Sequence, residues 1–211
     1  MATTSNIRED GSRLSRADRV FAHVEKAAAL LAGLGVLTLM ALAVVSVGGR
    51  NILGRPLAGY VDWIELLMPA IALLGVAWTQ RGGGHVRMDL VVGRLRGRAL
   101  WAFELLSTVA ALALIGLLVW GTWSHFGRSF DWGRPLFSSD STMDIGLPLW
   151  PSKLIVPLAL GLVALRLIIQ IVGFARGLRT DVTPPAVPLI ESAEALAAFE
   201  AATVEGWEAG R

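Results

Sequence analysis

Four apolar stretches set the strongest limit on how this chain can fold. They cover residues 27–47, 60–79, 100–123 and 147–174. About 20 apolar residues are enough for a helix to cross the hydrocarbon core of a bilayer, and a helix satisfies its backbone polar groups within its own segment. A β-barrel would need alternating segments of about 10 residues, and no such alternation appears. The sequence therefore predicts an all-α integral membrane protein with four transmembrane helices.

Composition narrows the class of function. The chain is 54% hydrophobic, which is more apolar than is usual for a soluble domain. A net charge of +2 gives no electrostatic basis for binding nucleic acid. The absence of cysteine excludes disulfides and thiolate metal sites, and the three histidines are too scattered to ligate haem between facing helices. Neither a phosphate-binding loop nor a nucleophile elbow is present, so we predict no enzyme activity, cofactor or metal.

The distribution of basic residues predicts the orientation, since short cytoplasmic loops carry an excess of Lys and Arg. We expect both termini and the 81–98 loop in the cytoplasm. The first apolar stretch exceeds the roughly 7–15 residues of a signal-peptide core, so we interpret it as a retained helix. The inner set is Arg8, Arg13, Arg16, Arg19, Lys26, Arg81, Arg87, Arg94, Arg96, Arg98, Arg176 and Arg179, against Arg50, Arg55, Arg128, Arg134 and Lys153 outside.

Three domains follow from this topology. We expect a cytoplasmic tail over 1–21, a four-helix membrane domain over 22–175, and an acidic cytoplasmic tail over 176–211. The stretch "TDVTPPAVP" at 180–188 is typical of an extended linker. The residues after it fit either a short acidic helix or a loosely ordered tail.

The charged stretch "RGGGHVRMDLVVGRLRGR" at 81–98 separates the second and third apolar stretches. Its apolar residues recur at the spacing of one helix face, and arginines flank that face. Three glycines allow a sharp turn before it. The pattern predicts an amphipathic helix over 86–98 lying flat on the cytoplasmic membrane surface. An ordinary basic loop would explain the arginines, but not the apolar face or Asp89.

Charges inside the membrane segments need partners or roles, because each is costly there. Arg50 ends the first stretch near the level of Glu65 in the second, and we expect a structural pair between them. The alternatives are a proton-coupling carboxylate at Glu65 or contact with another subunit. Glu104 and Arg166, in the third and fourth stretches, are expected to pair within the bundle or to reach a partner helix.

Several of these segments together resemble the small membrane subunit of tripartite ATP-independent periplasmic (TRAP) transporters. They are "HVRMDLV" at 85–91, which contains His85, Arg87 and Asp89; Arg50; Glu65 within "GYVDWIELLMPAIALLGVAW"; and "LPLWPSKLIVPLALGLVALRL" at 147–167. The resemblance covers about residues 20–175.

The resemblance implies a division of labour in a bacterial inner membrane. A periplasmic binding protein would capture a small carboxylate or sugar acid, and a large multi-helix subunit would import it with sodium. This chain would be a non-catalytic scaffold for the large subunit, with the bilayer as its other partner. The alternative is a self-sufficient small proton-coupled transporter that uses Glu65. We further expect the outer loop at 126–147, with Trp132, Asp140 and Asp144, to form part of the binding-protein docking surface or to pack on the large subunit.

Overall fold

A computed structural model of the chain describes residues 12–81, 98–131, 133–134 and 140–180. Within these residues the chain forms five helices and no strand. They are α1 (Arg13–Leu53), α2 (Tyr60–Leu74), α3 (Val76–Arg81), α5 (Arg98–Ser129) and α6 (Trp150–Thr180). Four spans, with α2 and α3 counted together, are long and apolar enough to cross a membrane. The predicted all-α class with four transmembrane helices is confirmed. Of the surface helix predicted at 86–98, residues 86–97 lie outside the described residues and Arg98 begins α5.

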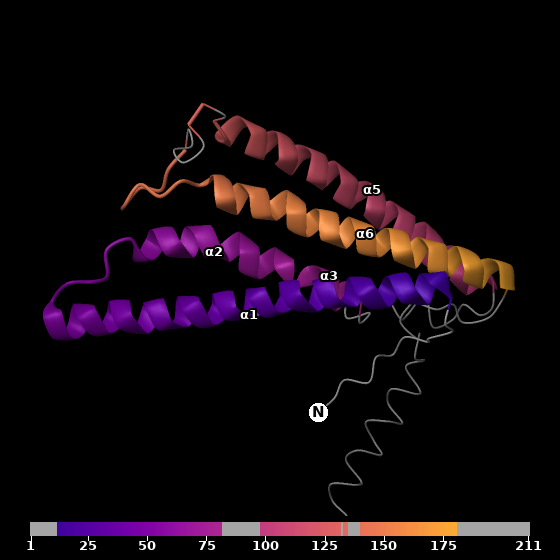
Figure 1. Ribbon diagram of the computed structural model, residues 1–211, viewed down its shortest axis with the longest axis horizontal. Coiled ribbons are helices and arrows are strands. Elements are labelled where there is room, and N and C mark those ends of the chain that lie inside the picture. Colours follow the sequence, from indigo (N-terminus) through magenta and orange to yellow (C-terminus); the bar gives the residue numbers. More distant parts are fainter. Residues whose placement is uncertain (1–11, 82–97, 132, 135–139, 181–211) are drawn as a thin grey trace, which may run out of the picture.

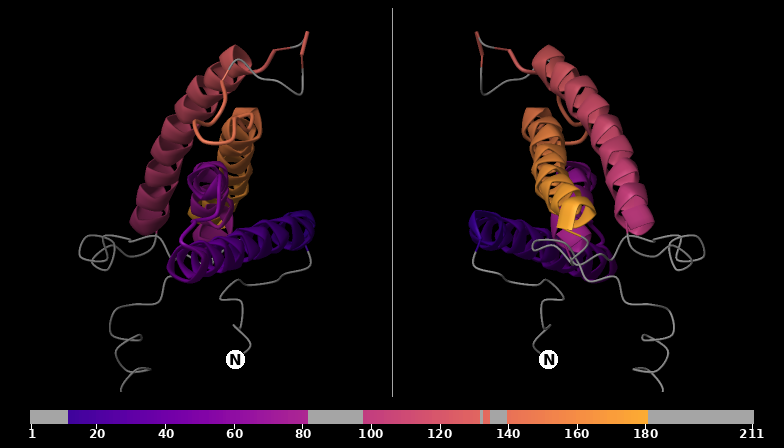
Figure 2. Two further views of the ribbon diagram at one scale, coloured as in Figure 1. Left: turned by 90° about the vertical axis from the view of Figure 1, so that its left-hand side faces the viewer. Right: turned by 90° about the vertical axis from the view of Figure 1, so that its right-hand side faces the viewer.

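The helices run side by side along the long axis of the molecule (Figure 1). α6 packs against α5 on one side and against α2 and α3 on the other, while α1 packs along α2 and α3. α6 is the central helix, because 39% of its most apolar stretch is buried, against 11% in each other span. The start of α1, the start of α5 and the end of α6 lie at one end of the bundle, and α3 runs toward this end (Figure 1). We call this end the inner end and the opposite end the outer end. Figure 2 shows the helices from the two ends of the long axis.

α1 is longer than its apolar stretch at both ends. Ser12 caps its start, since its hydroxyl accepts a hydrogen bond from the Ser15 backbone N–H at 3.2 Å. The first turns carry buried residues at helical spacing, among them Asp18, Ala22 and Glu25, so packing extends the helix over residues that the sequence analysis placed in a tail. Its 41 residues span about 61 Å at roughly 1.5 Å per residue. This is about twice the thickness of the hydrocarbon core.

The second apolar stretch forms two helices, where the sequence analysis expected one. Pro69 lies inside α2 and has no backbone N–H to donate to the preceding turn. The helix ends at Leu74, and α3 starts after Gly75. The break gives α3 its own direction at the inner end, where it carries Gln80 and Arg81 toward α1 and α6.

Apolar packing in the bundle centres on α6. Val163 and Leu167 of α6 form a core cluster with Ala77 of α3, and side chains of α5 pack against it. Nearer the inner end, the rings of Trp101 and Phe174 lie 6.3 Å apart. These contacts fix α5 and α3 on opposite sides of α6 and place the polar groups described below between helices.

Candidate functional sites at the two ends of the bundle

Four charged side chains from three helices meet inside the bundle toward its inner end. Asp18 and Glu25 come from α1, Arg81 from α3 and Arg166 from α6. Asp18 accepts hydrogen bonds from Arg166 and, at 2.8 Å, from Arg81. Glu25 lies 3.8 Å from the Arg166 Nε and 4.0 Å from the Arg81 Nε. We call these four residues the buried ion cluster.

The positions of these residues on their helices explain why they meet. Asp18 and Glu25 are seven residues apart, so they project from the same face of α1, and both are buried. Arg166 is fully buried in the middle third of α6. Arg81 ends α3 beside Gln80, whose side chain donates to Gln170 of α6 at 3.0 Å. The cluster and this amide pair together join α1, α3 and α6.

The buried ion cluster contains two carboxyl groups and two guanidiniums, so its charges balance when both carboxyl groups are ionised. Balance matters because an unpaired charge in a low-dielectric site is strongly destabilising. The carboxylate oxygens of Glu25 have no hydrogen-bond partner among the described residues. Glu25 is therefore held by charge attraction to the two arginines. The stability of the folded bundle around Glu25 depends on these arginines.

At the outer end, the loop between α5 and α6 is fastened to the start of α2. Asp62 is 2% exposed and accepts from the Thr142 hydroxyl and the Ile145 backbone N–H, each at 2.7 Å. The Asp144 carboxylate in turn accepts from the Gly59 N–H at 2.6 Å. We call Gly59, Asp62, Thr142, Asp144 and Ile145 the outer latch.

Gly59 is required in the outer latch for two reasons. Its φ of +73° lies in the left-handed region that side chains disfavour. A Cβ built on it would also lie 2.4 Å from the Cδ1 atom of Ile145. The glycine thus allows the loop to close directly on the first turn of α2.

A second polar group fixes the same loop to the ends of α5 and α6. Asp140 accepts from the Ser129 hydroxyl at 2.9 Å and from the Lys153 ammonium at 2.5 Å. These contacts hold the pKa of Asp140 below its usual value, with the Lys153 hydrogen bond as the largest cause. Asp140 is consequently an ionised structural residue at neutral pH.

This pKa shift predicts how the loop responds to acid. Because the pKa of Asp140 is lower in the folded loop than in an unfolded chain, the ionised carboxylate stabilises the folded loop at pH values above the ordinary pKa of Asp. This stabilisation is lost as the pH falls through the pKa of the folded state. We expect the titration midpoint of Asp140, followed by carboxyl-carbon NMR, to rise when Lys153 is replaced by Met. An equal midpoint in wild type and Lys153→Met would show that the ion pair is absent in solution.

The structure does not bring Arg50 and Glu65 together. Both are exposed, and among the described residues no ion pair joins them. The reason is the direction in which the side chains leave α2. Asp62 and Ala70 form the buried face of this helix, and Glu65 projects to one side of that face. The expected pair is therefore not formed within this chain, and the inward carboxylate of this helix is Asp62.

The other residues singled out from the sequence fall into four groups. Arg166 is used in the buried ion cluster with partners from α1. Glu104 is buried on α5, the helix that packs on α6. Asp140 and Asp144 are tied to Lys153 and Gly59 within the chain. His85, Arg87, Asp89 and Trp132 lie outside the described residues.

The arrangement of charges defines the class of protein. Among the described residues, no group of acidic or histidine side chains could hold a metal ion. The buried ion cluster joins three helices, and the outer latch joins α2 to the loop before α6, within four spans suited to a bilayer. These features define a small multi-pass helical membrane protein.

Comparison with known families identifies the particular kind of membrane protein. The family model for the DctQ component of tripartite ATP-independent periplasmic transporters matches residues 20–177. The chain belongs to this family and is the small membrane subunit of a TRAP transporter, not an enzyme. No curated protein matches it.

Proposed function

We propose that this chain is a scaffold subunit that supports the large membrane subunit of a sodium-coupled transporter importing small carboxylates or sugar acids. The observation that carries the proposal is the amount of apolar helix surface the chain leaves uncovered. On α1, Val44 is 73% exposed and Leu37 is 61% exposed, and on α5 Trp120 is 72% exposed. Such wide faces suit contact with lipid on one side and a larger membrane protein on the other.

Exposed charges near the outer end support the same proposal. Arg50 and Glu65 both point away from the interior of the bundle. An ionisable side chain at membrane depth normally faces a protein partner or water. Contact with the large subunit would supply that partner, whereas a proton path inside this chain would need Glu65 to face inward.

A substitution at Glu65 separates the scaffold from a self-sufficient proton-coupled transporter. In the complete transporter reconstituted in vesicles, we expect Glu65→Gln to keep the wild-type dependence of uptake on sodium and on pH, because coupling resides in the large subunit. Loss of ion coupling in Glu65→Gln, with the complex intact, would favour the self-sufficient transporter instead.

We also propose that the inner end faces the cytoplasm, which places both termini there in a bacterial inner membrane. The chain has no cysteine, so single-cysteine variants report location directly. Ser5→Cys and Glu205→Cys should resist an impermeant thiol reagent in intact cells, while Ser141→Cys in the exposed outer loop should react. Labelling at either terminus would reverse the proposed orientation.

The outer loop is proposed to face the arriving binding protein. Asp140 and Asp144 have partners within the chain, so charge reversal there would disturb the loop itself. Met143 between them is fully exposed on a loop held by the outer latch. The exposed apolar side chain of Met143, on a loop held in place, is better suited than either aspartate to direct contact with the binding protein.

A further inference from the structure

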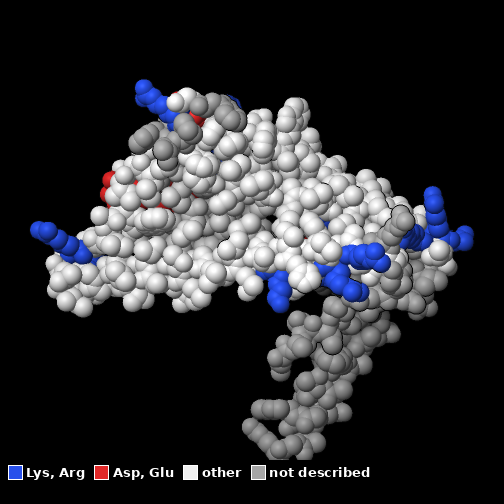
Figure 3. All heavy atoms as spheres, in the orientation of Figure 1, with Lys and Arg blue, Asp and Glu red and all other residues white. Residues whose placement is uncertain are grey.

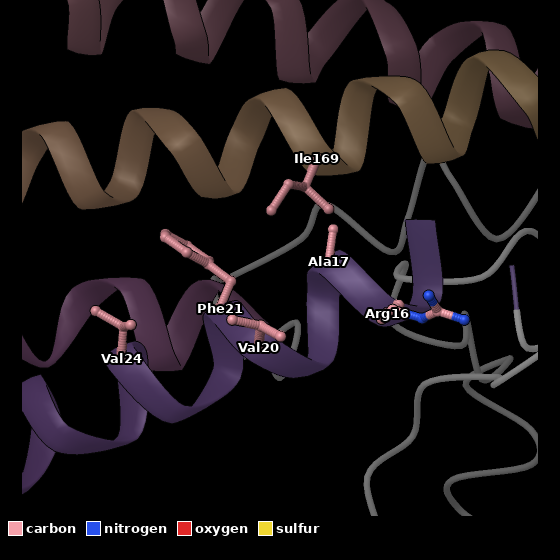
Figure 4. A pocket seen from close by; sticks show the side chains of 6 residues that line it. All are labelled: Arg16, Ala17, Val20, Phe21, Val24 and Ile169. Atoms are coloured by element: carbon pink, nitrogen blue, oxygen red, sulfur yellow. The ribbon is translucent and has the colours of Figure 1, made fainter. Parts of the chain in front are cut away.

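An open apolar groove lies between the first turns of α1 and the middle of α6. It encloses about 530 Å³ and is lined by Arg16, Ala17, Val20, Phe21, Val24 and Ile169. Figure 4 shows the apolar side chains arranged along α1, with Ile169 opposite and Arg16 at the end nearest the start of the helix. Arg16 and Val24 are eight residues apart, so the groove follows α1 for about 12 Å at roughly 1.5 Å per residue.

A row of basic residues runs beside this groove. Arg16, Arg19, His23 and Lys26 are spaced by three or four residues, so they share one face of α1, and all four are exposed. Lys and Arg side chains gather at this end of the molecule in Figure 3. A helix that combines a basic face with exposed apolar residues is typical of contact with an anionic membrane surface.

The acidic residues of the same helix segment do not weaken this positive surface. Asp18 and Glu25 face the interior, where Arg81 and Arg166 balance them. The buried ion cluster therefore leaves α1 with only cations on the surface beside the groove, within the described residues. This arrangement selects for a negatively charged ligand with an apolar part.

We propose that the groove binds one anionic phospholipid, with an acyl chain along Val20, Phe21 and Val24 and the phosphate at Arg16. The direction of the groove supports this orientation. Arg16 lies nearest the start of α1, where a headgroup would meet water, and Val24 lies farther into the bundle, toward the depth of the acyl chains. The site goes beyond the scaffold function and does not depend on another subunit.

Lipid binding to the purified, delipidated full chain tests the proposal. The probes are phosphatidylglycerol and phosphatidylcholine of equal chain length, with bound copies counted by native mass spectrometry. We expect saturable binding that favours phosphatidylglycerol. Arg16→Gln should weaken the binding of phosphatidylglycerol about fivefold, as expected for about 1 kcal/mol per basic residue at an anionic surface. Arg179→Gln, at an exposed arginine near the end of α6, should leave the affinity unchanged.

A second variant tests the groove separately from the charge. Val20 is 65% exposed, so the Val20→Trp variant should fold, and its indole should fill the groove. Binding of both lipids should then be weaker. Val109→Trp on α5 should leave the binding of both lipids unchanged. Equal affinities for the two lipids, or equal losses in Arg16→Gln and Arg179→Gln, would overturn the proposal. Displacement of the lipid by inorganic phosphate would show a simple anion site, and a dimer that Val20→Trp disrupts would show that a second copy occupies the groove.

Discussion

Replacing Arg166 with Met should destabilise the folded subunit by about 3–5 kcal/mol, the usual cost of removing one partner from a buried ion pair. The substitution leaves Asp18 and Glu25 facing a single guanidinium, that of Arg81, so one of the two carboxyl groups loses its counter-charge. Arg166 is 0% exposed, so water cannot readily compensate. Unfolding of the detergent-solubilised protein by a denaturing detergent, followed by circular dichroism, measures the change.

Two further variants make this result specific to the charge. Arg176→Met removes an exposed arginine from the same helix and should change stability by no more than about 0.5 kcal/mol. Adding Asp18→Asn to Arg166→Met restores charge balance. The double variant should therefore lose less folding stability than the sum of the losses in the two single variants. If Arg166→Met were no worse than Arg176→Met, the cluster would not stabilise the bundle.

The second large effect is expected at the outer latch. Asp62→Ala removes the acceptor for Thr142, Ile145 and, at 3.3 Å, the Asp144 backbone N–H. Hydrogen bonds to a charged group contribute about 1.5–3 kcal/mol each, although the freed donors regain water at this end. We expect the 140–149 loop to open, with hydrogen exchange at Ile145 accelerated at least about 10-fold, which corresponds to about 1.4 kcal/mol of local opening free energy.

A matched control for the outer latch is Asp131→Ala. Asp131 is exposed, and its carboxylate accepts only a local bond from the Gly133 N–H at 2.8 Å among the contacts described. This variant should leave exchange at Ile145 unchanged, and Asp62→Asn should fall between wild type and Asp62→Ala because one acceptor oxygen remains. Wild-type protection of Ile145 in Asp62→Ala would mean that the loop is held by other contacts.

The sequence was sufficient for the fold because membrane helices leave a strong local signal. Each apolar stretch had to form a helix to satisfy its backbone, and the structure confirms all four. Helix boundaries were harder. α1 begins as early as Arg13 because buried residues such as Asp18 and Glu25 pack against other helices. The average hydropathy of the segment does not predict this packing.

The site was less predictable because pairing between helices depends on their rotation and offset. From the sequence, a pairing role is assigned to Glu65 and none to Asp62, because sequence spacing alone does not show which face of α2 is buried. The sequence marks Arg166 as a charge that needs a partner, but no such role is assigned to Asp18, which falls in the predicted tail, or to Glu25, which falls just inside the predicted membrane domain. Their seven-residue spacing was the available signal for a shared face.

The central claim is that this chain supports a larger membrane subunit, and the mass of the complex extracted in mild detergent tests it most directly. A tag on this chain should recover a large multi-helix membrane protein in a fixed ratio, as measured by light scattering on a size-exclusion column. Substituting polar residues for exposed side chains such as Leu37 on α1 should reduce that recovery without unfolding this chain. A tagged chain that elutes alone, and that transports substrate alone in vesicles, would contradict the account.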